Sequence, residues 1–147
     1  MPKPLQKTNR ILGLDYGEKT IGLAISDENR SIALPLKQIE NKGTHNLKHI
    51  LSEIVSEYHV GAFVWGWPLK LDGSTRPLCE KIQKTAIEIS ETFHIPFSFV
   101  DERFSSKIMT LALSDLSHKK RSNRVDMMAA TQILQIALEQ IKNAENT

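Results

Sequence analysis

The order of short apolar runs and longer amphipathic stretches is the feature that most limits what this chain can fold into. Three short apolar runs come first, at 11–16, 20–26 and 31–36, with only brief polar turns between them. Gly17, Glu18 and Lys19 separate the first two runs, which predicts a hairpin or a tight meander. Three sequential antiparallel strands therefore open the predicted fold.

Two further apolar runs, at 60–65 and 97–101, alternate with stretches of helical periodicity. Helices are predicted at 44–58, with Thr44 as the N-cap, from about 77 to 93, at about 105–116, and at 123–143. Strands that alternate with helices need crossover connections and so lie parallel. The sequence thus predicts an α/β fold with a mixed five-stranded sheet, antiparallel in its first three strands and then parallel, flanked by helices.

Length and composition favour a single globular unit. The 147 residues are close to the usual length of one domain, so one domain is expected over 1–147, with an ordered core at about 10–142 and polar ends. Cys79 is the single cysteine, which excludes an internal disulfide and is consistent with a reducing compartment such as the cytoplasm. The polar first ten residues and the interrupted apolar run after them predict neither a secretory signal nor a membrane span.

Acidic residues stand at the ends of three elements that should meet at one edge of the sheet. Asp15 closes the first predicted strand, Asp101 and Glu102 close the fifth, and Asp126 opens the last predicted helix. Adjacent strand residues point to opposite faces, so only one of Asp101 and Glu102 can share a site with Asp15, and spacing does not say which. Each acid also has a structural interpretation, as a turn former, a surface acid or a partner of the helix dipole.

Clustered carboxylates of this kind suit a hard divalent cation, so the expected cofactor is Mg²⁺, with Mn²⁺ able to substitute. Two such ions can activate water and stabilise the leaving oxygen in phosphodiester cleavage, which needs no covalent nucleophile. The chain contains neither a Walker A motif nor a G-x-S-x-G motif, and Cys79 falls in a predicted helix without an obvious base. The pattern favours a metal-dependent nuclease.

The densest basic stretch of the chain runs from 118 to 124. It contains His118, Lys119, Lys120, Arg121 and Arg124, and no acidic residue interrupts it. Because the net charge of the whole chain is only +2, this local cluster rather than the composition suggests a nucleic-acid partner. The alternative is a solvated loop between two helices.

Four motifs are spread over most of the chain: LDYGEKTIGLAISD at 14–27, GWPLKLDGS at 66–74, DERFSS at 101–106 and RVDMMAATQIL at 124–134. In their order and separation they resemble the motifs of the YqgF or RuvX family of RNase H-like nucleases. The resemblance implies an RNase H-like domain with a divalent metal. It implies either processing of the 5′ end of pre-16S rRNA in ribosome biogenesis or cleavage of branched DNA such as Holliday junctions. It further implies that Asp15, Glu102 and Asp126 are the catalytic and metal-binding acids, which selects Glu102 over Asp101.

The resemblance also implies a nucleic-acid substrate, held by cations and hydroxyls around the carboxylates. Such contacts to phosphate ignore base sequence and weaken with salt. The residues expected to make them are Lys19, Arg103, Ser105, Ser106, Lys107, Lys119, Lys120, Arg121 and Arg124. Ribosomal assembly particles are a further expected partner. The chain is expected to be a monomer or a homodimer, and symmetric junction cleavage would favour the dimer.

Two other functional interpretations remain open at this point. Asp15, Tyr16 and Gly17 also resemble the phosphate-binding hairpin of actin-like and sugar-kinase ATPases, although such enzymes use two copies of their fold and this chain holds one. A non-catalytic RNA-binding assembly module would keep the basic stretch but not the metal. Trp65 and Trp67 offer rings on which a base could stack, but Trp65 is expected in the core.

Overall fold

A computed structural model describes residues 9–68, 73, 76–101 and 118–145, and of residues 118–127 the backbone only. Five strands form one sheet in the order β3-β2-β1-β4-β5. They are β1 (Arg10–Tyr16), β2 (Thr20–Ser26), β3 (Ala33–Glu40), β4 (Val60–Trp67) and β5 (Phe97–Asp101). β2 is antiparallel to β1 and β3, whereas β4 is parallel to β1 and β5. The predicted mixed sheet is confirmed.

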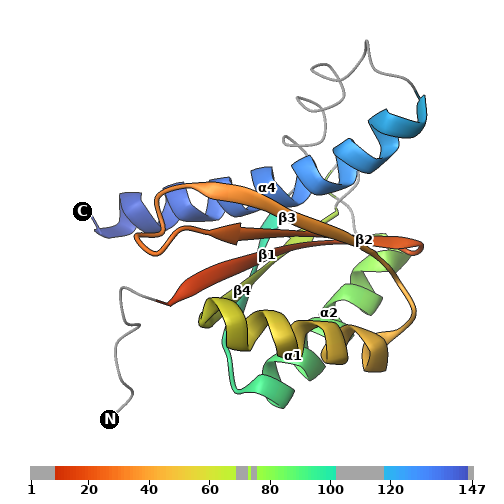
Figure 1. Ribbon diagram of the computed structural model, residues 1–147, viewed down its shortest axis with the longest axis horizontal. Helices are drawn as coiled ribbons and strands as arrows, with labels where there is room; N and C mark the ends of the chain where they lie inside the picture. Colours follow the sequence, from red (N-terminus) through yellow and green to blue (C-terminus); the bar gives the residue numbers. More distant parts are fainter. Residues whose placement is uncertain (1–8, 69–72, 74–75, 102–117, 146–147) are drawn as a thin grey trace.

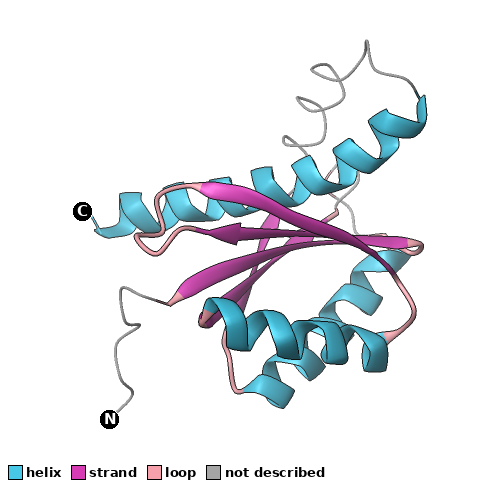
Figure 2. Ribbon diagram, viewed as in Figure 1, coloured by secondary structure: helices cyan, strands magenta, loops and turns pink. Residues whose placement is uncertain are grey.

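Helices cover both faces of this sheet (Figure 1). α1 (Thr44–Tyr58) and α2 (Pro77–Phe93) lie on one face, and α4 (His118–Glu145) lies on the other. Figure 2 shows the resulting three layers of helix, sheet and helix. The helices predicted at 44–58 and 77–93 are confirmed, while the helix predicted at 105–116 lies outside the described residues.

Two predicted boundaries are wrong. The third strand occupies 33–40 rather than 31–36, because the Asp27 carboxylate accepts hydrogen bonds from the N–H groups of Ser31 (2.7 Å) and Ile32 (3.0 Å) and keeps both residues in the turn. α4 begins at His118 rather than at 123, so the basic stretch is helical and its interpretation as a loop is wrong. The stretch has no Gly or Pro, and its Lys and Arg residues are good helix formers.

The start of α1 also differs from the prediction. Thr44 is the first residue of the helix and not its cap, because Gly43 occupies the N-cap position with φ 98° and ψ 170°. A side chain at that φ would be strained, which explains the glycine. No side chain caps the first turn of α1, and that turn contains no acidic residue.

Large side chains fill the core between the sheet and the α1/α2 layer. Leu12, Leu14, Phe63 and Trp65 all belong to this core, and Trp65 is completely buried, as predicted. The two helices are also joined at the surface by an ion pair between Lys48 and Glu88, with 3.1 Å between the Lys48 nitrogen and a carboxylate oxygen.

Smaller side chains fill the core between the sheet and α4, where Ala24, Val64 and Ala130 are buried. At Gly13 the helix lies directly on the backbone of β1. A Cβ atom added there would come within 2.8 Å of Leu134 Cβ and 3.2 Å of the Ala130 carbonyl oxygen. Only glycine therefore permits this separation between strand and helix.

The direction of α4 follows from its contacts. Its C-terminal half meets the turn between β2 and β3, where the Ala33 N–H donates to Gln135 Oε1 at 3.0 Å. That turn lies at the end of the sheet where β1 begins, since the Ile11 N–H donates to Ser26 Oγ at 2.9 Å. α4 is therefore antiparallel to β1, and its N-terminal half extends toward the end where β1 finishes (Figure 1).

Candidate functional site

Of the three predicted catalytic acids, Asp15 has a described side chain. It is half-buried near the end of β1 and lies opposite Gly22 of β2. Ile11 belongs to the core beneath α4 and Gly13 touches α4, so the alternation of strand residues places Asp15 on the same face. Its carboxylate is thus presented on the α4 side of the sheet.

Glycines lie beside Asp15 on both neighbouring strands. Gly22 is its direct partner on β2, and Gly66 of β4 follows Trp65, the partner of Leu14. Both glycines are buried. Directly paired residues share a face, so no side chain from either strand lies beside the Asp15 carboxylate at its own level. Glycine in a strand often marks a place where a ligand or another backbone comes close.

The turn between β1 and β2 is held rigidly next to Asp15. The Gly17 N–H donates to the Thr20 carbonyl at 2.9 Å, and a Cβ at Gly17 would be 2.7 Å from that oxygen. Asn41 fixes the turn from outside, since its side-chain N–H donates to the Gly17 carbonyl at 2.8 Å and its backbone N–H donates to the Lys19 carbonyl at 2.8 Å.

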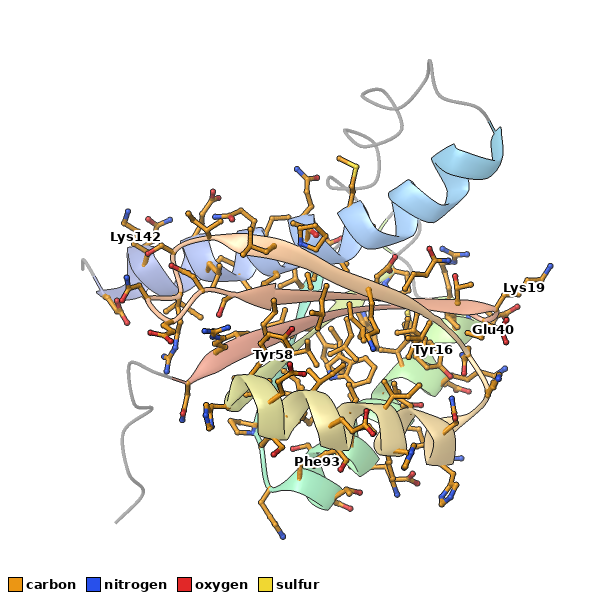
Figure 3. The ribbon with its side chains drawn as sticks, in the orientation of Figure 1. Tyr16, Lys19, Glu40, Tyr58, Phe93 and Lys142 are labelled. Atoms are coloured by element: carbon orange, nitrogen blue, oxygen red, sulfur yellow. The ribbon has the colours of Figure 1, made fainter. Side chains whose placement is uncertain are left out.

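Asn41 is not among the residues predicted from the sequence, although its position two residues before Gly43 is typical of a turn. The side chain of Lys19 is exposed at the tip of the β1–β2 turn and points away from the molecule (Figure 3). That position leaves it accessible to a substrate, as the prediction for Lys19 requires.

Asp101, at the end of β5, and Asp15 lie on opposite faces of the sheet. Trp67 and Asp101 are partners across the two strands, and the rings of Trp67 and Phe99 are 4.8 Å apart between centroids. Both rings pack against the α1/α2 core, whereas Val100 belongs to the core under α4. Alternation therefore places half-buried Asp101 on the face opposite to Asp15.

The other predicted site residues are described in part or not at all. The backbone positions of Lys119, Lys120, Arg121, Arg124 and Asp126 lie in the N-terminal part of α4, and their side chains are not described. The remaining ones lie outside the described residues, namely Glu102, Arg103, Ser105, Ser106 and Lys107.

The described residues were expected to include a carboxylate cluster and no membrane span. They contain no group of three or more His, Cys, Asp or Glu side chains close enough to hold a metal ion, but two of the three predicted ligands have no described side chain. No helix in the described part of the chain is long and apolar enough to cross a membrane.

Comparison with protein families and curated proteins gives concordant matches. The family model described as RuvX, Holliday junction resolvase, matches residues 9–140. A protein of Paramagnetospirillum magneticum is 38% identical over 137 residues, which cover 92% of this chain and 88% of its own length. One of Thermoanaerobacter pseudethanolicus is 35% identical over 137 residues, covering 91% and 99%. Both are named "Putative pre-16S rRNA nuclease".

Solved structures share the fold at low sequence identity. RuvC of T. thermophilus in complex with a Holliday junction substrate matches with a TM-score of 0.59 and 11% identity, covering 92% of this chain and 96% of that one. The Fowlpox virus resolvase in complex with Holliday junction DNA matches with a TM-score of 0.52 and 16% identity, covering 90% and 98%. The predicted RNase H-like fold is thereby confirmed.

Proposed function

Because the chain belongs to the RuvX family, we propose that it is a nuclease that hydrolyses phosphodiester bonds of pre-16S rRNA, at the 5′ end of the precursor in ribosome biogenesis. Relatives named for that RNA match nearly the full length of the chain, which supports the substrate. On this proposal residues 1–147 form one nuclease domain. It works in the cytoplasm with ribosomal assembly particles, as a monomer or a homodimer.

The observation that carries the proposal is the alignment of α4 with β1 at Gly13. From Gly13 to Asp15 the strand advances two residues, or about 6.8 Å. From Ala130 back to position 126 the antiparallel helix advances four residues, or about 6 Å, in the same direction. Ala130 touches Gly13, so position 126 comes level with Asp15 on the α4 face. We therefore assign Asp126 to the same site as Asp15.

Strand alternation supports Glu102 as the third acid. Val100 belongs to the α4 face and Asp101 to the opposite one, and alternation carried one position further would assign that position to the face of Asp15. Glu102 itself lies outside the described residues. Strand alternation thus supports the same choice of Glu102 over Asp101 that the family resemblance implies.

The donor set fits a divalent cation. Asp15, Glu102 and Asp126 supply carboxylate oxygens, the ligands that Mg²⁺ and Mn²⁺ prefer, and the β2 residue paired with Asp15 is the glycine Gly22. When bound, such a cation supplies an activated water and stabilises charge on the leaving oxygen. The protein's own part is to hold three acids at one sheet edge and to position the substrate strand.

Cations and hydroxyls around this edge bind the substrate in our proposal. Lys19 extends from the β1–β2 turn, and Lys119, Lys120, Arg121 and Arg124 come from the first turns of α4. Arg103, Ser105, Ser106 and Lys107 follow β5 directly in the chain. Contacts of this kind to phosphates predict binding that weakens steeply as salt is raised.

A second candidate substrate is a four-way DNA junction. It is favoured by the description of the matching family and by the fold shared with RuvC and the Fowlpox virus resolvase. Symmetric cleavage of a junction calls for two active sites related by a two-fold axis, so this candidate requires a homodimer. Sedimentation of the protein with and without junction DNA tests this candidate, because a protein that stays monomeric on the junction would exclude it.

The test is a cleavage assay with pre-16S rRNA, single-stranded RNA and a four-way DNA junction, in Mg²⁺ or Mn²⁺ and in EDTA. We expect metal-dependent cleavage that Glu102→Gln and Asp126→Asn abolish. Asp101→Asn is the matched control and should cleave nearly as well as the native protein, because Asp101 lies on the opposite face. Binding without cleavage in any metal would favour the non-catalytic assembly module, and loss of activity in Asp101→Asn alone would contradict the assignment of Glu102.

A further inference from the structure

A pocket of about 410 Å³ lies at the N-terminus of α1, on the face of the sheet opposite to Asp15. Its walls come from the end of β1, the β1–β2 turn, the segment before α1, and α2. Tyr16 lines it and lies between the sheet and the α1/α2 layer (Figure 3). None of its lining residues belongs to the proposed nuclease site.

The N-terminus of α1 presents unsatisfied N–H groups to this pocket. Gly43 and Thr44 are lining residues, no side chain caps the helix, and its first turn contains no acid. The first N–H groups of a helix have no partner within the helix, and the helix dipole places a partial positive charge there. Such an end favours an anion with several acceptor oxygens.

A buried hydroxyl in the same pocket points independently to a ligand. Thr85 of α2 lines the pocket and is only 6% exposed. Within the part of the chain that the structure describes, its hydroxyl makes no hydrogen bond, whereas the hydroxyl of Thr92 in the same helix donates to the Glu88 carbonyl at 2.8 Å. The described side-chain atoms that are buried without a partner are Trp65 Nε1 and Gln132 Oε1, so the Thr85 oxygen opens on the pocket, where an oxygen of a bound ligand can replace water as its partner.

The charges around the pocket favour an anion. Lys81 and Lys84 of α2 line it and are exposed. Two acids also line the pocket, Glu18 and Glu88. The charge of Glu88 is balanced by Lys48, whose nitrogen lies 3.1 Å from a carboxylate oxygen, so the two lysines face only the charge of Glu18 among the lining residues. The walls are also preformed, since the Gly43 N–H donates to the Asn41 side chain at 3.1 Å while Asn41 holds the β1–β2 turn.

We propose that this pocket binds a phosphate group. Its oxygens accept hydrogen bonds from the first N–H groups of α1 and from the Thr85 hydroxyl, and its charge is balanced by Lys81 and Lys84. The phosphate belongs either to a nucleic-acid strand or to a free nucleotide or inorganic phosphate. The first source rests on the proposed nuclease function: Asp15 and Tyr16 are consecutive and face opposite sides of one sheet edge, so a strand that crosses this edge reaches both.

The first test is a titration of the full chain with inorganic phosphate, followed through the backbone N–H signals in NMR spectra. We expect saturable shifts at Thr44, His45 and Asn46. Thr85→Val should weaken phosphate binding about fivefold while leaving the melting temperature unchanged or higher, since the substitution keeps the shape and removes an unpaired hydroxyl. Thr92→Val is the matched control from the same helix and should bind phosphate like the native protein.

The second test identifies the source of the phosphate. Asp15→Asn protein, which should not cleave, is titrated with fluorescent single-stranded RNA and with a nucleoside monophosphate, each with and without Lys84→Gln. Lys142→Gln, an exposed lysine at the far end of α4, is the control. Weaker RNA binding assigns the site to the substrate strand, and weaker monophosphate binding with unchanged RNA binding assigns it to a free ligand.

Two results would overturn the proposal. One is the absence of shifts in the first turn of α1 with either phosphate or RNA. The other is a Thr85→Val variant that melts at a lower temperature and binds phosphate normally, which would mean a structural role for the hydroxyl. Neither depends on cleavage, so a failure of the nuclease proposal is recognised separately, by full activity of Asp15→Asn.

Discussion

The two faces of the sheet are built from side chains of different size. The face toward α1 and α2 carries Leu12, Leu14, Phe63 and Trp65, while the face toward α4 carries glycine or alanine at many of the corresponding positions. Large buried side chains contribute most of the hydrophobic stabilisation. The face with small side chains instead lets a helix approach the strands, and Gly22 is the direct partner of Asp15 on it. One face thus stabilises the fold, and the other is shaped for the site.

Asp15→Asn is the sharpest test of this division and has the largest expected effect. Asparagine keeps the shape of the side chain and removes its charge, so a metal would lose a ligand. We expect the cleavage rate to fall by at least about 10³, equivalent to roughly 4 kcal/mol of transition-state stabilisation. Single-turnover cleavage and thermal melting measure rate and stability. A rate within tenfold of the native protein would exclude Asp15 as a ligand.

Trp65→Ala tests the opposite face and should affect stability rather than chemistry. Trp65 is completely buried, so its truncation should lower the free energy of unfolding by about 3–5 kcal/mol. Urea denaturation measures the loss. Trp65→Phe should lower the free energy of unfolding by less. The indole nitrogen that this substitution removes from Trp65 is buried and has no hydrogen-bond partner in the described structure. A cleavage rate of folded Trp65→Ala protein as low as that of Asp15→Asn would contradict the division of stability and catalysis between the two faces.

Gly13→Ala tests how closely α4 must lie on β1. The added Cβ would be 2.8 Å from Leu134 Cβ, so helix and strand must move apart. Such overpacking should cost about 1–3 kcal/mol of stability and lower the cleavage rate as well, because α4 carries Asp126. Denaturation and cleavage are measured on the same preparation. An unchanged rate despite lower stability would show that the site tolerates a displaced helix.

Gly22→Ala separates access to Asp15 from helix packing. Alanine is at least as favourable as glycine in a strand, so stability should change little. A methyl group beside the Asp15 carboxylate should reduce the cleavage rate about tenfold, or roughly 1.4 kcal/mol. Titration of the metal dependence shows whether the loss is in metal affinity. Native activity would mean that the glycines beside Asp15 serve only packing.

Asp27→Ala should have the smallest effect, since Asp27 belongs to the turn between β2 and β3 and to neither core. Hydrogen bonds from the N–H groups of Ile32 and Ser31 hold the pKa of Asp27 below its ordinary value of 3.8. The ionised form therefore stabilises the folded state above pH 3.8, and that contribution is lost as pH falls through the lowered pKa. The variant should lose less than about 1 kcal/mol at neutral pH. The difference in melting temperature between the variant and the native protein should shrink as the pH is lowered from 7 to 3.

Sequence reasoning predicted the elements of the fold because periodicity and turn residues determine them locally. It did not predict the boundaries that depend on tertiary or turn contacts, such as the start of β3, which Asp27 sets through two backbone hydrogen bonds. The alternative of a loop for the basic stretch is also wrong, since that stretch is helical and contains no residue that prevents a helix.

The site was less predictable than the fold. Spacing placed Asp15, Asp126 and the Asp101–Glu102 pair at one edge, but only the burial of Val100 on the α4 side distinguishes the two faces of β5. The contact of Gly13 with Leu134, which aligns α4 with β1, joins residues more than a hundred positions apart, and no local pattern predicts it.

That long separation has a consequence for the newly made protein. β1 emerges from the ribosome early, whereas α4 is the latest of the described elements to be synthesised. The elements that contain the bulky core precede α4 in the chain, and the proposed pairing of Asp15 with position 126 needs α4 docked on Gly13. Translation itself therefore delays the proposed site, which cannot form in a nascent chain until α4 has left the ribosome.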